Sequence, residues 1–168
     1  MVVANDLNVV LDNLQRNGLV FGAYADEEER YLVCQTPYFP ELSLPCVKMY
    51  VGEEVTSKFS PMFKNEFQIT PMIRNYVELV RGSYMDGDIQ KNGNFICLYI
   101  TEYPYFPLKD NPELRPSGDY TDIRYITYDE AKHLYSIGEL NEYTMFYISR
   151  IHNWRAENES MGTNRNNV

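Results

Sequence analysis

The stretch from Pro45 to Ile69 constrains the fold of this 168-residue chain more than any other part of it. It begins as a strand-like segment, turns at Gly52-Glu53-Glu54 and continues into a segment with helical features. Ser60 is a good helix N-cap, and Pro61 suits the first helical position, where its missing N–H costs no hydrogen bond. The sequence therefore predicts a strand, a tight acidic turn and a short helix that begins after Ser60.

The spacing within this stretch resembles the Nudix box, the loop-helix-loop with which Nudix hydrolases hold magnesium against a diphosphate. The family pattern is G-x5-E-x7-R-E-U-x-E-E-x-G-U, in which U is an apolar residue. The matching positions are, in chain order, Glu53, Phe63, Glu66 and Ile69. Pro45 and the Gly52-Glu53 pair also lie where many family members have Pro and Gly-Glu.

The departures from the pattern fall on positions that matter for metal binding and for the loop path. Met62 and Asn65 stand where the pattern has carboxylates, and Pro61 replaces its arginine. Val47 and Gln68 stand where the pattern has glycines. Because glycine permits a positive φ, we expect a residue with a side chain at 47 or 68 to require a different backbone path.

Composition bounds the class of protein. With 44% apolar residues, the chain can build one domain with a core, and it is too short for two ordinary domains. A formal net charge of −9 disfavours bulk nucleic-acid binding and anionic membranes, because such a field repels phosphates. It leaves open a nucleotide that is held through bound Mg²⁺.

The cysteines and the N-terminus point to a reducing compartment. Cys34, Cys46 and Cys97 are odd in number and fit no zinc spacing, and the apolar runs around Cys34 and Cys97 favour buried thiols. Met1 to Asn8 does not have the features of a secretory leader, and no apolar run reaches membrane-spanning length. We expect a cytoplasmic protein.

The first half of the chain predicts one helix and several strands. Asp6 to Asn17 has the apolar spacing of a short amphipathic helix. Leu19 to Tyr24 and Tyr31 to Gln35 read as the two strands of a hairpin around a charged turn. After the box, the end of Met72–Arg81 and Phe95 to Thr101 read as a second hairpin, with Asn92-Gly93 as its turn signal.

The second half predicts a strand and two helices. A short strand covers about Ile123 to Ile126, and the capping box Thr127-Tyr128-Asp129-Glu130 starts a helix through Ile137, with Gly138 as its C-cap. Asn141 caps a second helix to about Arg155. Residues 157–168 are polar and predict a loose tail behind a single domain of residues 1–156.

This order of elements, over about residues 18–155, also resembles the latter half of many Nudix proteins. The resemblance implies an α/β (α+β) fold with a mixed, mainly antiparallel sheet sandwiched between helices. It also implies a chemistry, in which two or three Mg²⁺ ions help water to attack a nucleoside diphosphate linked to another group.

Three carboxylates remain as oxygen ligands for Mg²⁺ or as catalytic groups, and they are Glu53, Glu66 and Asp119. We expect Glu66 and Glu53 to be the metal ligands, and all three to act in catalysis only if the protein is active. Each also has a structural interpretation: Glu66 as an exposed helical side chain, Glu53 as a turn residue and Asp119 as the start of an Asx-turn.

A second feature is a repeated tetrapeptide, which occurs as Pro37-Tyr38-Phe39-Pro40 and as Pro104-Tyr105-Phe106-Pro107. Each copy follows an expected strand and can mark a strand exit with an aromatic anchor. Alternatively, Tyr38, Phe39, Tyr105 and Phe106 form a paired aromatic clamp for the base of a ligand.

Three functions follow from these observations. The first is a Nudix-fold protein with an eroded metal site that binds a nucleotide-diphosphate derivative or a protein partner. The second is an active, divergent Nudix hydrolase that cleaves a nucleoside diphosphate linked to another moiety. The third is a structural or assembly subunit that uses the fold as a scaffold.

Overall fold

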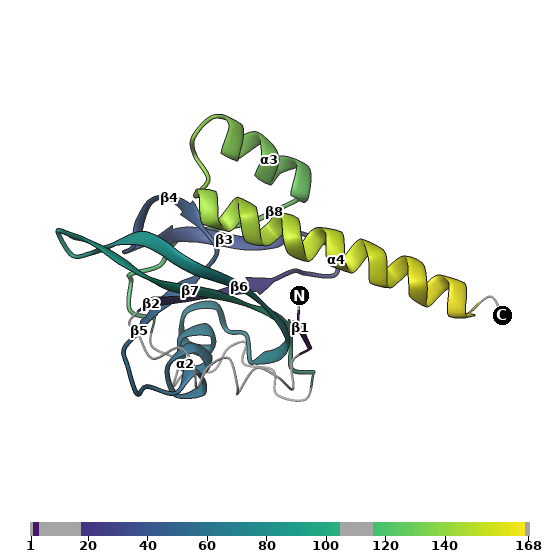
Figure 1. The fold of residues 1–168 in the computed structure, drawn as a ribbon, viewed down its shortest axis with the longest axis horizontal. Helices are drawn as coiled ribbons and strands as arrows, with labels where there is room; N and C mark the ends of the chain where they lie inside the picture. Colours follow the sequence, from purple (N-terminus) through teal and green to yellow (C-terminus); the bar gives the residue numbers. More distant parts are fainter. Residues whose placement is uncertain (1, 4–17, 105–115, 167–168) are drawn as a thin grey trace.

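The structure is a computed structural model that describes residues 2–3, 18–104 and 116–166. The helix expected at Asp6–Asn17 lies outside the described residues. The described part contains two sheets flanked by helices (Figure 1). The five-stranded sheet has the order β1-β6-β7-β2-β5, and the three-stranded sheet has the order β4-β3-β8.

The larger sheet consists of β1 (Val2–Val3), β6 (Pro71–Asp86), β7 (Ile89–Glu102), β2 (Gly18–Tyr24) and β5 (Cys46–Met49). The smaller one consists of β4 (Phe39–Ser43), β3 (Tyr31–Thr36) and β8 (Thr121–Ile126). The helices are α2 (Val55–Phe67), α3 (Tyr128–Ser136) and α4 (Glu142–Asn166). Only β2 and β7 pair in parallel among the described strand pairs. The expected class, a mixed and mainly antiparallel sheet between helices, is confirmed.

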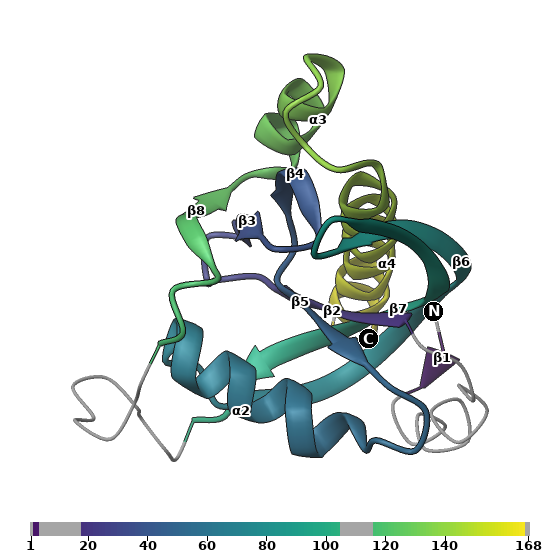
Figure 2. The same ribbon diagram turned by 90° about the vertical axis from the view of Figure 1, so that its left-hand side faces the viewer.

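The five-stranded sheet is buried on both faces, with α4 on one side and α2 on the other (Figure 2). Successive residues of β2 alternate between these faces: Leu19 and Phe21 pack in the cluster with α4, and Val20 packs in the cluster with α2. This alternation follows from the pleat of a strand. The central strands therefore read as continuous apolar runs.

One glycine sets how closely α2 approaches the sheet. A Cβ at Gly22 of β2 would lie 2.4 Å from the ring of Phe63 and 2.7 Å from the ring of Phe59, both on α2. Contacts this short do not occur, so the helix can rest on the sheet here only because position 22 lacks a side chain.

The start of α2 differs from the expectation. The helix begins at Val55 with Glu54 as N-cap residue, and Pro61 lies inside it. A proline in a helix interior costs about 3 kcal/mol. Burial of apolar side chains at helical spacing, each worth about 1.5–3 kcal/mol, outweighs that cost. Those side chains are Val55, Phe59, Met62 and Phe63.

One expected strand pairing and one expected turn are also wrong. The strands β2 and β3 do not form a hairpin; they lie in different sheets and share only the isolated bridge between Ala25 and Tyr31. The hairpin of β6 and β7 does form, but it turns at Gly87, where φ is +64°, and Asn92-Gly93 lies inside β7.

The C-terminal helices begin as expected. The capping box of Thr127 and Glu130 is present at the start of α3, and the Asn141 side chain accepts hydrogen bonds from the backbone N–H groups of Tyr143 and Thr144. Residues 157–166, expected as part of a loose tail, continue α4 to Asn166 and extend past the body of the protein (Figure 1). Within the described chain, none of the helices has the length and apolar character needed to span a membrane.

Burial along α4 predicts how the chain tolerates truncation. Ile151 is fully buried, whereas residues 156–158 are exposed. We expect truncation after Asn158 to leave the melting temperature within about 2 °C, because the removed sequence carries few apolar residues. Ile151→Ala should lower it by about 5–15 °C, as expected for a core truncation of 2–5 kcal/mol. A fall of ten degrees in the truncated protein would show that the end of α4 contributes to folding.

Candidate functional site

The two predicted metal ligands of the box lie at opposite ends of α2. Glu53 precedes the helix and Glu66 lies in its last turn. With a rise of 1.5 Å per residue, the backbone positions of these residues are separated by about 16 Å or more along the helix axis. Because Mg²⁺–oxygen bonds are about 2.1 Å long, the two carboxylates do not share one ion in this arrangement.

Glu53 is engaged in the loop that precedes the helix. Its Oε1 accepts a hydrogen bond from the backbone N–H of Tyr50 at 2.7 Å and lies 3.3 Å from Nζ of Lys58. The hydrogen bond from Tyr50, followed by the contact with Lys58, lowers the pKa of the Glu53 carboxyl. This pattern matches the turn-fixing interpretation of Glu53.

Glu66 is engaged at the other end of the helix. Its Oε1 accepts a hydrogen bond at 2.8 Å from the backbone N–H of Ser117, in the segment that leads to β8. Asp119 is exposed in that same segment, where its backbone N–H donates to Oγ of Ser117. The fold therefore brings Glu66 near the segment that holds Asp119, and it leaves Glu53 apart.

The substituted positions of the box face different surroundings. Met62 is only 9% exposed and packs with Val55, Phe59 and Phe63 beneath the sheet. Asn65 is half-buried. Among the residues that the structure describes, no three His, Cys, Asp or Glu side chains are grouped so that they could hold a metal ion. The described residues of the box thus do not fit a site for two or three Mg²⁺ ions.

Gln68 keeps the backbone shape that the pattern assigns to glycine. It is the C-cap of α2, with φ 57° and ψ 38°, and its N–H bonds back to the carbonyl of Lys64. Val47, at the first glycine position, lies in β5 and is buried. At position 68, the expectation of a changed backbone path is therefore wrong: the side chain is accommodated in the left-handed region.

The two aromatic candidates that the structure describes lie in different surroundings. Phe39 is buried among the rings of the core, and Tyr105 and Phe106 lie outside the described residues. Tyr38 is half-buried, and its hydroxyl accepts a hydrogen bond from the backbone N–H of Lys48 at 3.1 Å. Burial raises the pKa of Tyr38 to about 12, so the phenol keeps its proton at neutral pH.

Tyr38 and Phe39 line a small hollow of about 200 Å³ between β4, the end of β6 and the start of α4. The other side chains in its wall that matter here are Met85, Gln90 and Asn141. Sites for drug-sized ligands typically have volumes of about 300–1,000 Å³, so this hollow is smaller than such a site. The hollow can therefore receive part of a ligand, such as a single ring.

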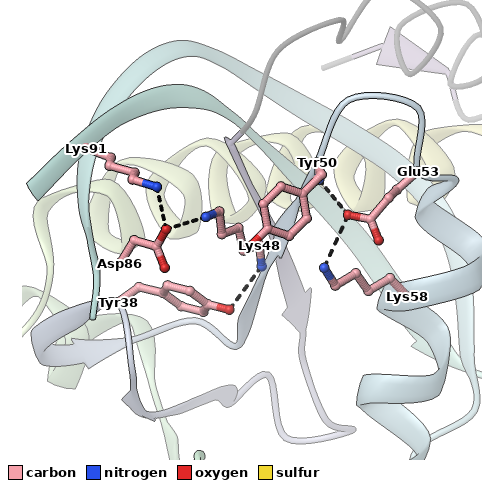
Figure 3. A network of polar contacts seen from close by, with 7 residues as sticks. All are labelled: Tyr38, Lys48, Tyr50, Glu53, Lys58, Asp86 and Lys91. Carbon is pink, nitrogen blue, oxygen red and sulfur yellow. Dashed lines mark hydrogen bonds and ion pairs between the residues drawn. The ribbon is translucent and has the colours of Figure 1, made fainter. Parts of the chain in front are cut away.

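A network of lysines lies directly beside this hollow (Figure 3). Lys48 of β5 forms an ion pair with Oδ2 of Asp86, at the tip of the hairpin of β6 and β7, and Lys91 bonds to the same oxygen at 2.7 Å. The ammonium of Lys48 is 4.4 Å from the centre of the Tyr50 ring, and that of Lys58 is 4.7 Å from it. The lysine network is therefore defined as Lys48, Lys58 and Lys91 with Tyr50, Asp86 and Glu53.

The charges of this network stabilise one another. Hydrogen bonds from Lys48 and then Lys91 lower the pKa of Asp86 to about 2. Burial alone would lower the pKa of Lys48, but its bonds to Asp86 and Tyr50 raise it above the usual value. Lys48 is thus positively charged at neutral pH, although its side chain is buried.

Sequence reasoning missed this network. One signal was available, because Lys48 is a charged residue between the apolar residues Val47 and Met49 in a short strand. A lysine at such a position needs a partner, since an unpaired buried charge is costly. The partner, Asp86, is 38 residues away in the chain, and only the tertiary fold brings it beside Lys48.

Comparisons with known proteins support the fold alone. No protein-family model and no curated protein matches the sequence. Among solved structures, a Nudix hydrolase from Nitrosomonas europaea superposes with a TM-score of 0.59 at 13% identity, over 82% of this chain and 89% of that one. An Ap4A hydrolase from C. elegans gives 0.53 at 13% identity, over 84% and 98%. A MutT protein from Methanosarcina mazei gives 0.52 at 10% identity, over 82% and 93%. The chain therefore has the Nudix fold.

The surroundings of Met62 predict the effect of restoring the carboxylates of the box. In Met62→Glu with Asn65→Glu, the first glutamate enters an apolar cluster without a partner, which costs several kcal/mol. We expect a lower melting temperature and no gain in Mg²⁺ affinity by calorimetry. The single variant Asn65→Glu is the control, and it should stay within about 0.5 kcal/mol of the parent. Tight Mg²⁺ binding by a fully stable double variant would contradict this assignment of position 62.

The left-handed conformation of Gln68 predicts a stabilising substitution. Gln68→Gly should relieve backbone strain of about 1–2 kcal/mol, of which part is lost to the greater freedom of glycine in the unfolded chain. We expect a net gain of about 0.5–1 kcal/mol in the free energy of unfolding, measured in urea. Asn65→Gly, within the helix, should instead destabilise by a similar amount. Equal effects at both positions would rule out strain at Gln68.

Proposed function

We propose that this protein binds a nucleotide-diphosphate derivative through its Nudix fold and does not hydrolyse it. The observation that carries the proposal is the state of the box. Met62 is buried among apolar side chains, and Glu53 and Glu66 are engaged at opposite ends of α2.

The chemistry explains why this arrangement disfavours hydrolysis. Cleavage of a diphosphate needs neutralised phosphoryl oxygens and an activated water, which bound metal ions supply in such reactions. A single carboxylate at Glu66 provides few oxygen ligands for an ion that prefers near-octahedral coordination. We infer that the protein retains the shape of a diphosphate-binding fold without the ligands for turnover.

The hollow beside Tyr38 is the best candidate for the ring of such a ligand. Its wall contains aromatic and amide side chains, which can stack on a base and hydrogen-bond to its edge. The wall also contains the carboxylates of Glu41 and Glu142, so it suits the ring of a ligand and not its phosphates. Since the hollow holds only part of a ligand, the remainder lies outside it. The backbone N–H of Lys48 bonds to the hydroxyl of Tyr38, so the lysine network lies beside this ring (Figure 3).

Two larger hollows are less suitable for a diphosphate. The first, of about 560 Å³, is lined by Asp26, Glu27 and Glu102 together with Arg155, so its acidic side chains exceed its basic ones. The second, of about 460 Å³, contains Asp122 and Arg124. These two side chains form two hydrogen bonds with each other, at 2.9 and 2.7 Å. Neither hollow presents an excess of positive charge to a phosphate.

The proposal predicts little or no hydrolysis of ADP-ribose, dinucleoside polyphosphates or nucleoside triphosphates across Mg²⁺ and Mn²⁺ concentrations. Loss of a metal Lewis acid removes several kcal/mol of transition-state stabilisation, and each ~1.4 kcal/mol is tenfold in rate. Product release by the purified protein is the measurement, with Glu66→Gln as the matched variant. Robust turnover that disappears in Glu66→Gln would establish the alternative, an active divergent hydrolase.

Binding is measured separately by calorimetry with ADP-ribose. Tyr38→Leu should weaken binding about tenfold, since stacking of a base on an aromatic ring is worth about 1–3 kcal/mol. Tyr135→Leu on α3 is the control, because this exposed tyrosine lies outside the hollow. No binding of any nucleotide by the parent protein would refute the proposal and leave the scaffold function.

A further inference from the structure

We propose that Lys48, Lys58 and Lys91 form a diphosphate subsite that works without a metal ion. This inference rests on the proposed function for the identity of the complete ligand. The subsite itself is a property of the lysine network and can be tested with inorganic pyrophosphate alone.

The position of Lys48 is the first observation. Its side chain is 7% exposed, although it carries a charge, and it lies on β5, directly before the loop that leads to α2. A buried ammonium is costly unless it is paired, and Asp86 and the Tyr50 ring supply partners. Of the three N–H donors of an ammonium, these contacts leave capacity for a further acceptor.

Lys48 and Lys91 are spaced for one phosphoryl group. Both ammonium groups are within hydrogen-bonding distance of Oδ2 of Asp86, so they are no more than about 6 Å apart. A tetrahedral phosphoryl group with two oxygens directed at two cations spans such a gap. Asp86 occupies the position between them, and it shows that this point accepts a negatively charged oxygen (Figure 3).

Lys58 is placed for the second phosphoryl group. The Tyr50 ring lies between Lys58 and Lys48, within 5 Å of each ammonium (Figure 3). Lys58 meets Glu53 at 3.3 Å, through an oxygen that already accepts the shorter bond from the backbone of Tyr50. Tyr50 is 49% exposed, so a ligand can reach part of its ring from solvent.

The charge balance favours an anion here. The network contains three ammonium groups and two carboxylates, so it carries a net charge of +1 in a chain of net charge −9. Anions are repelled by most of such a surface and are attracted to the cationic exception. In this subsite, lysines neutralise the charge of the diphosphate directly. In a full Nudix box, carboxylates bind Mg²⁺, and the Mg²⁺ neutralises that charge.

The alternative is that these pairs only brace the tip of the β6–β7 hairpin against β5. In a purely structural role, Asp86 stabilises the hairpin by pairing with Lys48, and its loss would leave the Lys48 ammonium without this carboxylate. In a subsite, Asp86 competes with the ligand for Lys48 and Lys91. The two interpretations therefore differ in whether the parent protein, with Asp86 in place, binds a diphosphate through Lys58 and Lys91.

The experiment is calorimetric titration of the full chain with inorganic pyrophosphate in the presence of a chelator. We expect binding that weakens as salt is raised, and about tenfold weaker binding in Lys58→Gln and in Lys91→Gln. Asp86→Asn should bind pyrophosphate several-fold more tightly, since a competing carboxylate is removed. Melting temperatures identify any variant that fails to fold, and the two lysine variants change only partly exposed side chains.

Lys132→Gln is the matched control, because Lys132 of α3 also pairs with a carboxylate, Asp129, and lies over a tyrosine ring, that of Tyr128. It should leave the affinity unchanged. Any of three results would overturn the subsite. The first is pyrophosphate binding that requires Mg²⁺, and the second is an equal loss of affinity in Lys132→Gln and in the two test variants. The third is weaker pyrophosphate binding by Asp86→Asn. ADP-ribose that binds only with Mg²⁺ would also overturn it and leave the proposed function intact. Pyrophosphate binding through the lysines without any nucleotide binding would support the subsite and refute the proposed function.

Discussion

The contact of Phe59 and Phe63 with Gly22 fixes α2 on the sheet, and the rest of the candidate site depends on it. The rings lie where a side chain on β2 would otherwise be, so the helix cannot rotate or withdraw without opening the core. This anchoring places Met62 toward the sheet and Glu66 toward the segment before β8. The geometry of the box is thus a consequence of packing, and the chemistry of each position follows from the side chain placed there.

Local signals in the sequence predicted local structure well. The capping box at Thr127 and the N-cap at Asn141 depend only on neighbouring residues, and both form. Pairing between strands was harder, because β2 has the same apolar pattern whichever strand lies beside it. Its neighbours are β5 and β7, and each paired residue of β7 lies 76 positions further along the chain, as in Gly18 and Asn94. The start of α2 was missed since burial of four apolar side chains outweighs the penalty of Pro61.

The candidate site was predictable only where it coincides with the box. The pattern identified Glu53 and Glu66 but assumed that both reach one ion, whereas the length of α2 separates them. Tyr38 was identified through its aromatic tetrapeptide, and the structure places it in the wall of a hollow. The lysine network could not be read from the sequence, because Lys48, Asp86 and Lys58 come from three elements that only the tertiary fold brings together.

The shape of the fold and its metal chemistry are under different constraints. Gln68 adopts the left-handed C-cap conformation of α2 at a cost of about 1–2 kcal/mol, whereas glycine would adopt it with less strain. The backbone therefore keeps this conformation although the residue has a side chain. By contrast, Met62 replaces a carboxylate with a side chain that adds to the core. Under the proposed function, a diphosphate that binds at this loop without metal ligands needs another source of positive charge. Lys48 lies on the strand that enters this loop and Lys58 lies in the first turns of α2, so the same anchoring that positions the box also positions these cations.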